Sequence, residues 1–297
     1  MIRIKPLCSW TDPATLFARL CRQSQDGAGR WNDLWMSPDH REPDCWLVVN
    51  APRRHGAWRN QRHRPERTIL WSVEHSQATW RRTYNYSRWE HDPRYRVVLN
   101  HRRRLNWVEF HIGHDYEHLK ATTPDKGRTL SAIASGMYTL PGHTRRIDFL
   151  RNLDGRDLSF LATPFDHFGF DNRHGLTHYR GPLQAYQKES GLDPYRYSIA
   201  VEAIDEPNYV TEKFFDCILC ETLPFYWGCS NLEQWFDPEC FVRLDLENPD
   251  AAYLTLRQTI EADEWTRRLP AIRRAKQRIL DEYNLFPVLE TVVREFA

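Results

Sequence analysis

The stretch from Tyr197 to Asp245 constrains the fold more than any other part of the chain. It begins with an apolar run, YSIAVEA, continues as DEPNYVTEKFFDCILCETLPFYWG and ends in FVRLD. The apolar run is typical of a buried strand, and residues 211–221 have the one-sided apolar pattern of an amphipathic helix. Strand, helix and second strand in this order form a unit with which α/β proteins hold phosphate-bearing ligands. We therefore expect an α/β protein with a parallel sheet.

The start of the predicted helix is suited to an anion. Thr211 can cap this helix, and Glu212 and Lys213 then fall in its first turn. Unpaired backbone N–H groups and the positive end of the helix dipole favour an anion there, and Lys213 adds a mobile positive charge. A carboxylate repels phosphate, so the natural partners of Glu212 are hydroxyl groups such as those of a ribose or a hexose. The pair predicts a sugar nucleotide as ligand.

Composition narrows the class of protein. The chain has 297 residues, enough for two domains, and its 41 basic residues are balanced by 40 acidic ones. This balance gives no overall field that favours a polyanionic partner. The seven cysteines are odd in number and scattered, which argues against a disulfide framework and favours a cytoplasmic location. No apolar run is long enough to span a membrane, so we expect no transmembrane segment, and peripheral membrane contact stays open.

Other segments continue the alternation of strands and helices. The best candidate for a domain boundary is the loop 138–143, because it contains Pro141 and Gly142. We therefore predict domains of residues 1–140 and 141–297, with terminal helices able to pack back on the first domain. The predicted strands are 2–10, 45–50, 67–74, 130–135, 197–203, 222–227 and 241–244, and the predicted helices are 12–21, 144–153, 211–221 and the segments after Pro249.

Several motifs resemble one known family. The segments PYRYSIAVEA, NYVTEKFFDCILCETLPFYWGCSNLEQWFDPECFVRLD and YNLFP resemble the carboxyl-terminal domain of the fucosyltransferases of glycosyltransferase family 10. Upstream, PERTILWSVEHS, KGRTLSAIAS and PGHTRRIDFLRNL are similar to the same family in the same order. The resemblance spans most of residues 65–287. It implies a GT-B fold, in which two Rossmann-like domains face each other across a cleft, the first on the acceptor side and the second holding the donor nucleotide.

The resemblance also implies an activity: inverting, metal-independent transfer of fucose from GDP-fucose to a hydroxyl of a glycan acceptor, without a cofactor. It assigns Lys213 to the diphosphate and Glu212 to nucleotide or sugar hydroxyls, with Tyr209 just before them. The second cation for the diphosphate is Arg146, preferred to the neighbouring Arg145. Ser135 matches a position near the donor.

Glycosyl transfer needs charges of both signs. Negative charge develops on the departing diphosphate, so fixed cations such as Arg146 and Lys213 stabilise the transition state. Inversion needs a carboxylate that takes the proton from the attacking hydroxyl. Our candidate for this base is Glu74, which ends the strand-like run TILWSVE and matches the family's strand-then-glutamate motif. Partial burial there should raise the pKa of Glu74.

Two positions leave the donor sugar open. Ala203 and Gly136 stand where the family commonly has asparagine, so hydrogen bonds to the donor are lost and another GDP-sugar becomes an alternative. A non-catalytic sugar-nucleotide-binding protein is a further alternative. The arginine-rich run Arg53–Arg67 allows a protein that binds polyanions, but a nucleic-acid surface is less favoured than contacts to an acceptor.

Neither the histidines nor the cysteines predict a metal site. His111, His114 and His118 share a face only on a helix, and Gly113 disfavours one, so loop histidines are the better interpretation. Cys217 and Cys220 form a CxxC inside the predicted helix without a second pair, which is typical of small core residues.

Overall fold

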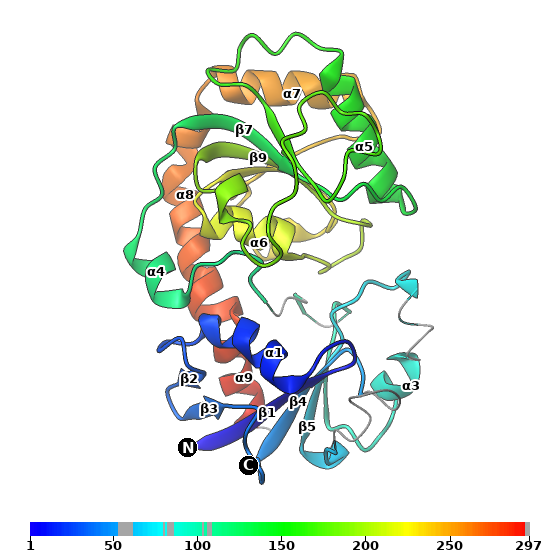
Figure 1. Cartoon of the computed structure of the whole chain (residues 1–297), viewed down its shortest axis with the longest axis vertical. Coiled ribbons are helices and arrows are strands. Elements are labelled where there is room, and N and C mark those ends of the chain that lie inside the picture. Colours follow the sequence, from blue (N-terminus) through cyan, green and yellow to red (C-terminus); the bar gives the residue numbers. More distant parts are fainter. Residues whose placement is uncertain (53–61, 80, 82–85, 103, 106–108, 295–297) are drawn as a thin grey trace. The chain divides into compact units, whose positions relative to one another are not determined.

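The chain forms two compact units. The computed structural model describes residues 1–52, 62–79, 81, 86–102, 104–105 and 109–294. The first unit contains Met1–Phe110, Asp115–Lys120 and Leu280–Ala297, and the second contains His111–His114 and Ala121–Ile279. Each unit is built around its own sheet with helices packed on it (Figure 1). The predicted α/β fold class is confirmed.

The first unit has a six-stranded sheet of order β2-β3-β1-β4-β5-β6. All neighbouring strands are parallel except the edge strand β2, which runs antiparallel to β3. The strands are β1 (Ile2–Cys8), β2 (Arg30–Trp31), β3 (Leu34–Met36), β4 (Cys45–Val49), β5 (Thr68–Trp71) and β6 (Val97–Leu99).

Apolar side chains from the four parallel strands β1, β4, β5 and β6 form a core with two aromatic residues of a short helix. The cluster contains Leu7, Val48, Leu70 and Val98 from the strands and Tyr86 and Trp89 from α3. Helix α1 begins where Asp12 accepts a hydrogen bond from the main-chain N of Thr15, at 2.9 Å. The helices are α1 (Pro13–Leu20), α3 (Tyr86–Glu90), α4 (Tyr116–Ala121) and α9 (Leu285–Val293).

The second unit has a five-stranded, fully parallel sheet of order β11-β10-β9-β7-β8. From β7 the chain moves outward to β8, then returns to the other side of β7 as β9 and continues outward to β11. The strand order therefore reverses between β7 and β9. The strands are β7 (Arg128–Ile133), β8 (Asp166–Phe168), β9 (Tyr195–Val201), β10 (Leu223–Trp227) and β11 (Val242–Arg243).

The helices of the second unit contact one another in a row. Helix α5 contacts α7, α7 contacts α8, and α8 contacts α6 (Figure 1). The apolar face of α6 is held by aromatic packing, since the ring of Phe214 lies 5.3 Å from that of Tyr226 and 5.0 Å from that of Phe236. The helices are α5 (Pro141–Asp154), α6 (Glu212–Leu219), α7 (Pro249–Glu261) and α8 (Glu264–Arg278).

The division between the units falls near residue 120 and not at the expected residue 140. Strand β7 pairs with β8 and β9, so the residues before the loop 138–143 already belong to the second sheet. The chain leaves the second unit again at a π-helical turn, Ile279–Tyr283. We expected terminal helices to pack back on the first domain. Residues 280–297 do belong to the first unit, whereas α7 and α8 stay in the second unit.

Most predicted strands and helices are present, with ends displaced by a few residues. The strand expected at 67–74 ends at Trp71, and the one expected at 130–135 runs from Arg128 to Ile133. The helix expected at 144–153 begins earlier, at Pro141. Among the described residues, the short strands β2, β3, β6 and β8, each of two or three residues, were not predicted. Such short segments contain too few residues for a periodic pattern.

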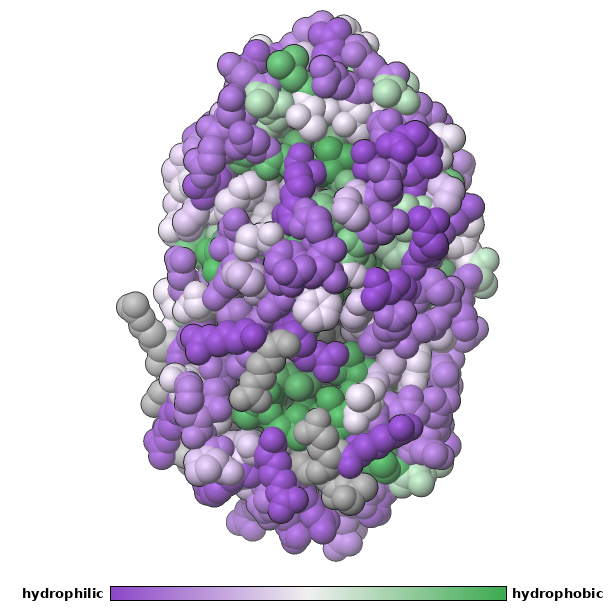
Figure 2. Space-filling view, turned by 180° about the vertical axis from the view of Figure 1, so that it is seen from behind, coloured by the Kyte–Doolittle hydropathy of each residue, from purple (hydrophilic) through white to green (hydrophobic). Residues whose placement is uncertain are grey.

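Hydrophilic side chains predominate on the face in Figure 2, and a hydrophobic area is visible on the first unit, in the lower part of the view. In the described residues, no helix combines the length and the apolar character that crossing a membrane requires.

Candidate functional site

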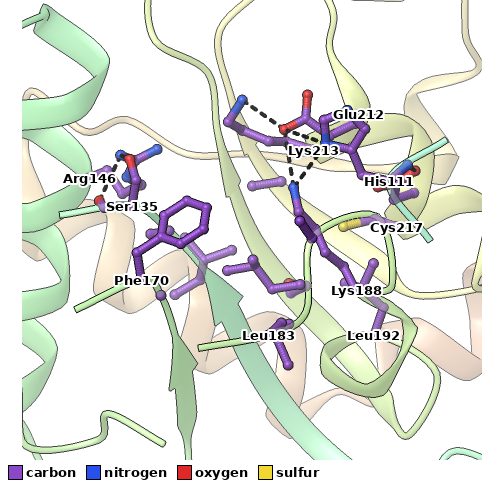
Figure 3. A pocket seen from close by; sticks show the side chains of 18 of the residues that line it. His111, Ser135, Arg146, Phe170, Leu183, Lys188, Leu192, Glu212, Lys213 and Cys217 are labelled. Carbon is purple, nitrogen blue, oxygen red and sulfur yellow. Dashed lines mark hydrogen bonds and ion pairs between the residues drawn. The ribbon is translucent and has the colours of Figure 1, made fainter. Parts of the chain in front are cut away.

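A cavity of about 400 Å³ lies within the second unit, next to the carboxyl ends of β7 and β9. Open parallel sheets bind ligands at such a place, because the helices that follow the two strands leave in opposite directions and open a crevice. Apolar residues form much of its wall, and a group of charged side chains gathers at the start of α6 (Figure 3). The charged residues in its lining are Arg146, Lys188, Glu212, Lys213 and Asp216.

The start of α6 is fixed by a buried carboxylate. Thr211 is the N-cap, and its hydroxyl oxygen accepts from the main-chain N of Lys213 at 3.4 Å. Glu202, just after β9, is fully buried. It accepts hydrogen bonds from the main-chain N of Thr211 at 2.8 Å and from its hydroxyl at 2.7 Å. The end of β9 thus determines where the helix begins.

Lys213 lies between two carboxylates. Its Nζ is 3.0 Å from the hydroxyl of Thr211 and 3.4 Å from one oxygen each of Glu202 and Glu212. Burial acts to lower the pKa of Lys213, but Glu212 and then Glu202 outweigh it, so the pKa is raised. The side chain is therefore a fixed cation at neutral pH.

Three basic side chains lie close to the carboxylate of Glu212. Its Oε1 lies 3.4 Å from Nζ of Lys213, 3.4 Å from Nζ of Lys188 and 3.8 Å from Nδ1 of His111 (Figure 3). Burial acts to raise the pKa of Glu212, but these three groups outweigh it and hold the pKa well below its ordinary value. Glu212 is consequently an ionised acceptor, suited to hydroxyl groups.

Arg146 reaches the cavity from the second turn of α5. Its Nη2 donates to the carbonyl and hydroxyl oxygens of Ser135, both at 3.1 Å, whereas its buried Nε has no hydrogen-bond partner in the described part of the chain. Burial lowers the pKa of Arg146 to about 10, against the opposing effect of Glu202 and Glu212, so it stays positively charged. By contrast, Arg145 pairs with Glu247 and stacks over Trp227.

A glycine allows α5 to approach this place. The main-chain N of Gly142 donates to the carbonyl of Ala203 at 2.9 Å. A Cβ atom at position 142 would overlap the carbonyl oxygen of Glu202. Only glycine therefore permits the first turn of α5 to pack against the end of β9, which brings Arg146 to the cavity.

The structure brings four of the six predicted site residues into this cavity: Ser135, Arg146, Glu212 and Lys213. Tyr209 is buried but is not in the cavity lining. Glu74 belongs to the first unit, where it lies half-buried in a bend three residues after β5. Its carbonyl oxygen accepts from Arg81 at 3.4 Å. The role of Glu74 as a base remains a prediction.

The site also contains residues that were not predicted from the sequence, among them His111, Lys188, Glu202 and Asp216. Glu202 carried a signal, since it is the one charged residue of the apolar run YSIAVEA. Lys188 carried none, because it lies in the long connection between β8 and β9. Its main-chain N donates to the carbonyl of His111 at 3.0 Å, which joins two segments far apart in the chain.

His111 and His114 have different partners. His114 pairs with Asp193 at 2.6 Å, whereas His111 faces Glu212. Within the described ranges, no group of three or more His, Cys, Asp or Glu residues could hold a metal ion. Cys217 and Cys220 are buried, as predicted for core residues.

Part of the predicted basic run, residues 53–61, lies outside the described residues. Its described arginines, Arg62, Arg64 and Arg67, are exposed.

Comparison with known proteins shows the fold. The chain resembles an α-glucosyltransferase solved in complex with UDP-glucose and DNA containing an abasic site, with a TM-score of 0.55, 9% identity and 99% of both chains covered. It also resembles a mutant of S. aureus TarM solved with UDP among its ligands, with a TM-score of 0.52 and 11% identity, covering 84% of this chain and 55% of that one. The chain has a GT-B fold.

Sequence comparison gives a local match. A segment of 66 residues, 22% of the chain, is 35% identical to the α-(1,3)-fucosyltransferase FucT of Helicobacter pylori. The match covers 14% of that relative's length. No protein-family model matches the chain. The predicted resemblance to a fucosyltransferase is thus confirmed over this segment.

Proposed function

We propose that the protein is a glycosyltransferase that moves fucose from GDP-fucose to a hydroxyl of a glycan acceptor. The observation that carries the proposal is the convergence of Arg146, Lys213 and Glu212, from two helices, on one cavity at the point where the strand order reverses. The local identity to a fucosyltransferase supports the choice of reaction.

The two cations are suited to a nucleoside diphosphate. When the bond between the sugar and the diphosphate breaks, negative charge accumulates on the departing oxygen. Lys213, Arg146 and the N-terminus of α6 supply positive charge that is already in place and needs little reorganisation. In other transferases a divalent metal stabilises this negative charge. Since Lys213 and Arg146 can perform that task here, we infer that the reaction is metal-independent.

Glu212 is suited to a diol of the donor. An ionised carboxylate next to Lys213 accepts hydrogen bonds from hydroxyl groups and repels phosphate oxygens. We therefore assign Glu212 to hydroxyls of the ribose or of the sugar. Lys188 and Lys213, each 3.4 Å from its Oε1, favour the ionised form when the donor binds.

We assign the role of general base to Glu74. In a single displacement, the acceptor oxygen forms its bond to the anomeric carbon while the bond to the diphosphate breaks, and the configuration inverts. The hydroxyl proton passes to the carboxylate of Glu74, and GDP leaves with the electron pair of the broken bond. The glycan acceptor would then be held mainly by the first unit.

The donor is tested by thermal shift with a panel of GDP-, UDP- and CMP-sugars, followed by measurement of GDP release with acceptor glycans. GDP-fucose should stabilise the protein most. A shift with GDP-mannose and none with GDP-fucose would indicate another GDP-sugar, and no shift with any GDP compound would contradict the proposal.

A pair of variants separates an enzyme from a binding protein. Glu74→Gln should abolish turnover and leave the affinity for GDP unchanged, whereas the exposed Glu42→Gln of the same unit should change neither. Wild-type protein that binds GDP-fucose but neither transfers nor hydrolyses fucose would be a non-catalytic binding protein.

A further inference from the structure

We propose that Asp216 selects guanine as the base of the donor, with its carboxylate accepting hydrogen bonds from N1–H and from the exocyclic amino group. The inference rests on the proposed function, since it requires a nucleotide in the cavity of the second unit. It adds a specificity residue to the residues that hold the diphosphate and the hydroxyls.

Asp216 has the right position along α6. It lies one turn after Glu212 on the same face of the helix, and both side chains are part of the cavity lining. With the diphosphate at Lys213 and the ribose hydroxyls at Glu212, the base extends beyond the ribose. Asp216 is the next ionisable side chain in that direction along the helix.

The surroundings of Asp216 are suited to a flat apolar ring. Leu192, Ile199 and Cys217 are part of the same cavity lining. Leu192 and Cys217 lie on the side of the cavity opposite Arg146 and Ser135 in Figure 3. Apolar side chains thus line the part of the cavity that is remote from Arg146 and are available to a base, as a nucleotide requires.

The carboxylate of Asp216 is incompletely paired. The residue is 2% exposed. Its Oδ1 accepts from the main-chain N of His111 at 3.3 Å, and its Oδ2 has no hydrogen-bond partner in the part of the chain that the structure describes. A buried acceptor without a donor is costly and rare in folded proteins. A donor group on the ligand would account for it.

The electrostatics of Asp216 agree with this interpretation. Burial raises the pKa of Asp216 to about 7, with a further increase from Glu212, and His111 and Lys188 offset only part of the effect. The protein itself thus leaves the charge of this carboxylate incompletely compensated.

Guanine is the common base whose hydrogen-bonding edge fits a carboxylate. It carries two adjacent N–H donors, N1–H and the amino group at C2, which match the two oxygens of Asp216. In adenine and cytosine a single amino group stands beside a ring nitrogen that accepts. In uracil the N3–H donor is flanked by two carbonyl oxygens. These acceptors would face the carboxylate and repel it.

The test measures nucleotide affinities by calorimetry. Wild-type protein should bind GDP about tenfold or more tightly than IDP, which lacks the amino group. Asp216→Asn should weaken GDP binding and strengthen XDP binding, because its amide can donate to the C2 carbonyl of xanthine. The matched control, Asp125→Asn, changes an exposed residue of the same unit and should keep the wild-type preference.

The outcomes separate the two proposals. If the wild-type protein binds no GDP, the proposed function fails, and the role of Asp216 fails with it. If it binds GDP but treats GDP and IDP alike, only the role of Asp216 is overturned, and this comparison needs no variant. If Asp216→Asn folds and still prefers GDP to XDP as the wild type does, the role is likewise overturned.

Discussion

The carboxylate of Glu202 accepts two hydrogen bonds from Thr211, one from its main-chain N at 2.8 Å and one from its hydroxyl at 2.7 Å. This contact joins the end of β9 to the N-cap of α6. The same carboxylate lies 3.4 Å from Nζ of Lys213 and acts electrostatically on Arg146. A single buried anion therefore positions the helix that carries Lys213 and compensates both proposed diphosphate cations.

Glu202→Ala should destabilise the protein strongly. It leaves the N-terminus of α6 without its acceptor and Lys213 without a buried counter-charge, which is expected to lower the free energy of unfolding by about 3 kcal/mol or more. Urea denaturation measures the loss. The matched control is Glu247→Ala, which removes the partner of Arg145 from an exposed ion pair and should cost less than about 1 kcal/mol. Equal losses in the two variants would contradict this role of Glu202.

Neighbouring arginines provide a test of the diphosphate site. Arg146→Lys keeps the charge but shortens the side chain and removes the guanidinium that donates to Ser135, so GDP should bind about tenfold more weakly. Arg145→Lys changes a residue paired with Glu247 and should leave the affinity within about twofold. Calorimetric titration with GDP measures both. A larger loss in Arg145→Lys would exchange the roles of the two arginines.

Gly142→Ala should displace α5. The added methyl group would overlap the carbonyl oxygen of Glu202, which belongs to the backbone and cannot rotate away. We expect a loss of stability of about 2 kcal/mol or more and a weaker affinity for GDP, because Arg146 moves with the helix. Gly127→Ala is the control, since a Cβ atom there meets nothing within 4 Å. Thermal unfolding and GDP titration of both variants check the prediction.

The start of α6 was predictable because its signals are local. Thr211 as N-cap, Glu212 and Lys213 in the first turn and the apolar stripe that follows are all contained in one short segment. Arg146 needed the family resemblance, since its neighbour Arg145 has the same chemistry. Even so, the predicted helix began at Thr144, because Pro141 was assigned to a boundary loop, although proline is favoured at the first position of a helix and does begin α5.

The rest of the site depends on contacts between distant segments. Lys188 and His111 reach Glu212 because the backbone of Lys188 bonds to that of His111, and no local pattern contains this pairing. The domain boundary was misplaced for a similar reason. The loop with Pro141 and Gly142 has the composition of a linker, but the pairing of β7 with β9 places it inside the second unit.

The raised pKa of Asp216 predicts a pH-dependent cost in stability. Its ordinary pKa of 3.8 applies to the unfolded chain, whereas burial raises the pKa to about 7 in the folded protein. Below both values the carboxyl group is neutral in both states and costs nothing. As the pH rises, the unfolded chain ionises first, so the folded state loses relative stability until the pH passes about 7, and the cost is constant above that.

Asp216→Asn removes this titration and should therefore stabilise the ligand-free protein at high pH. The three groups that face the carboxylate, His111, Lys188 and Glu212, are unchanged in the variant, so the difference from wild type isolates Asp216. The two proteins should be equally stable near about pH 4, and the variant should gain up to about 4 kcal/mol by about pH 8. Urea denaturation across this range measures the difference, with Asp125→Asn as the exposed control. A gain that does not grow with pH would show that the Asp216 carboxylate is not buried as the structure has it. Saturating GDP should reduce the gain at pH 8, because the two carboxylate oxygens of the aspartate can accept from both N–H donors of guanine, whereas asparagine has a single acceptor oxygen.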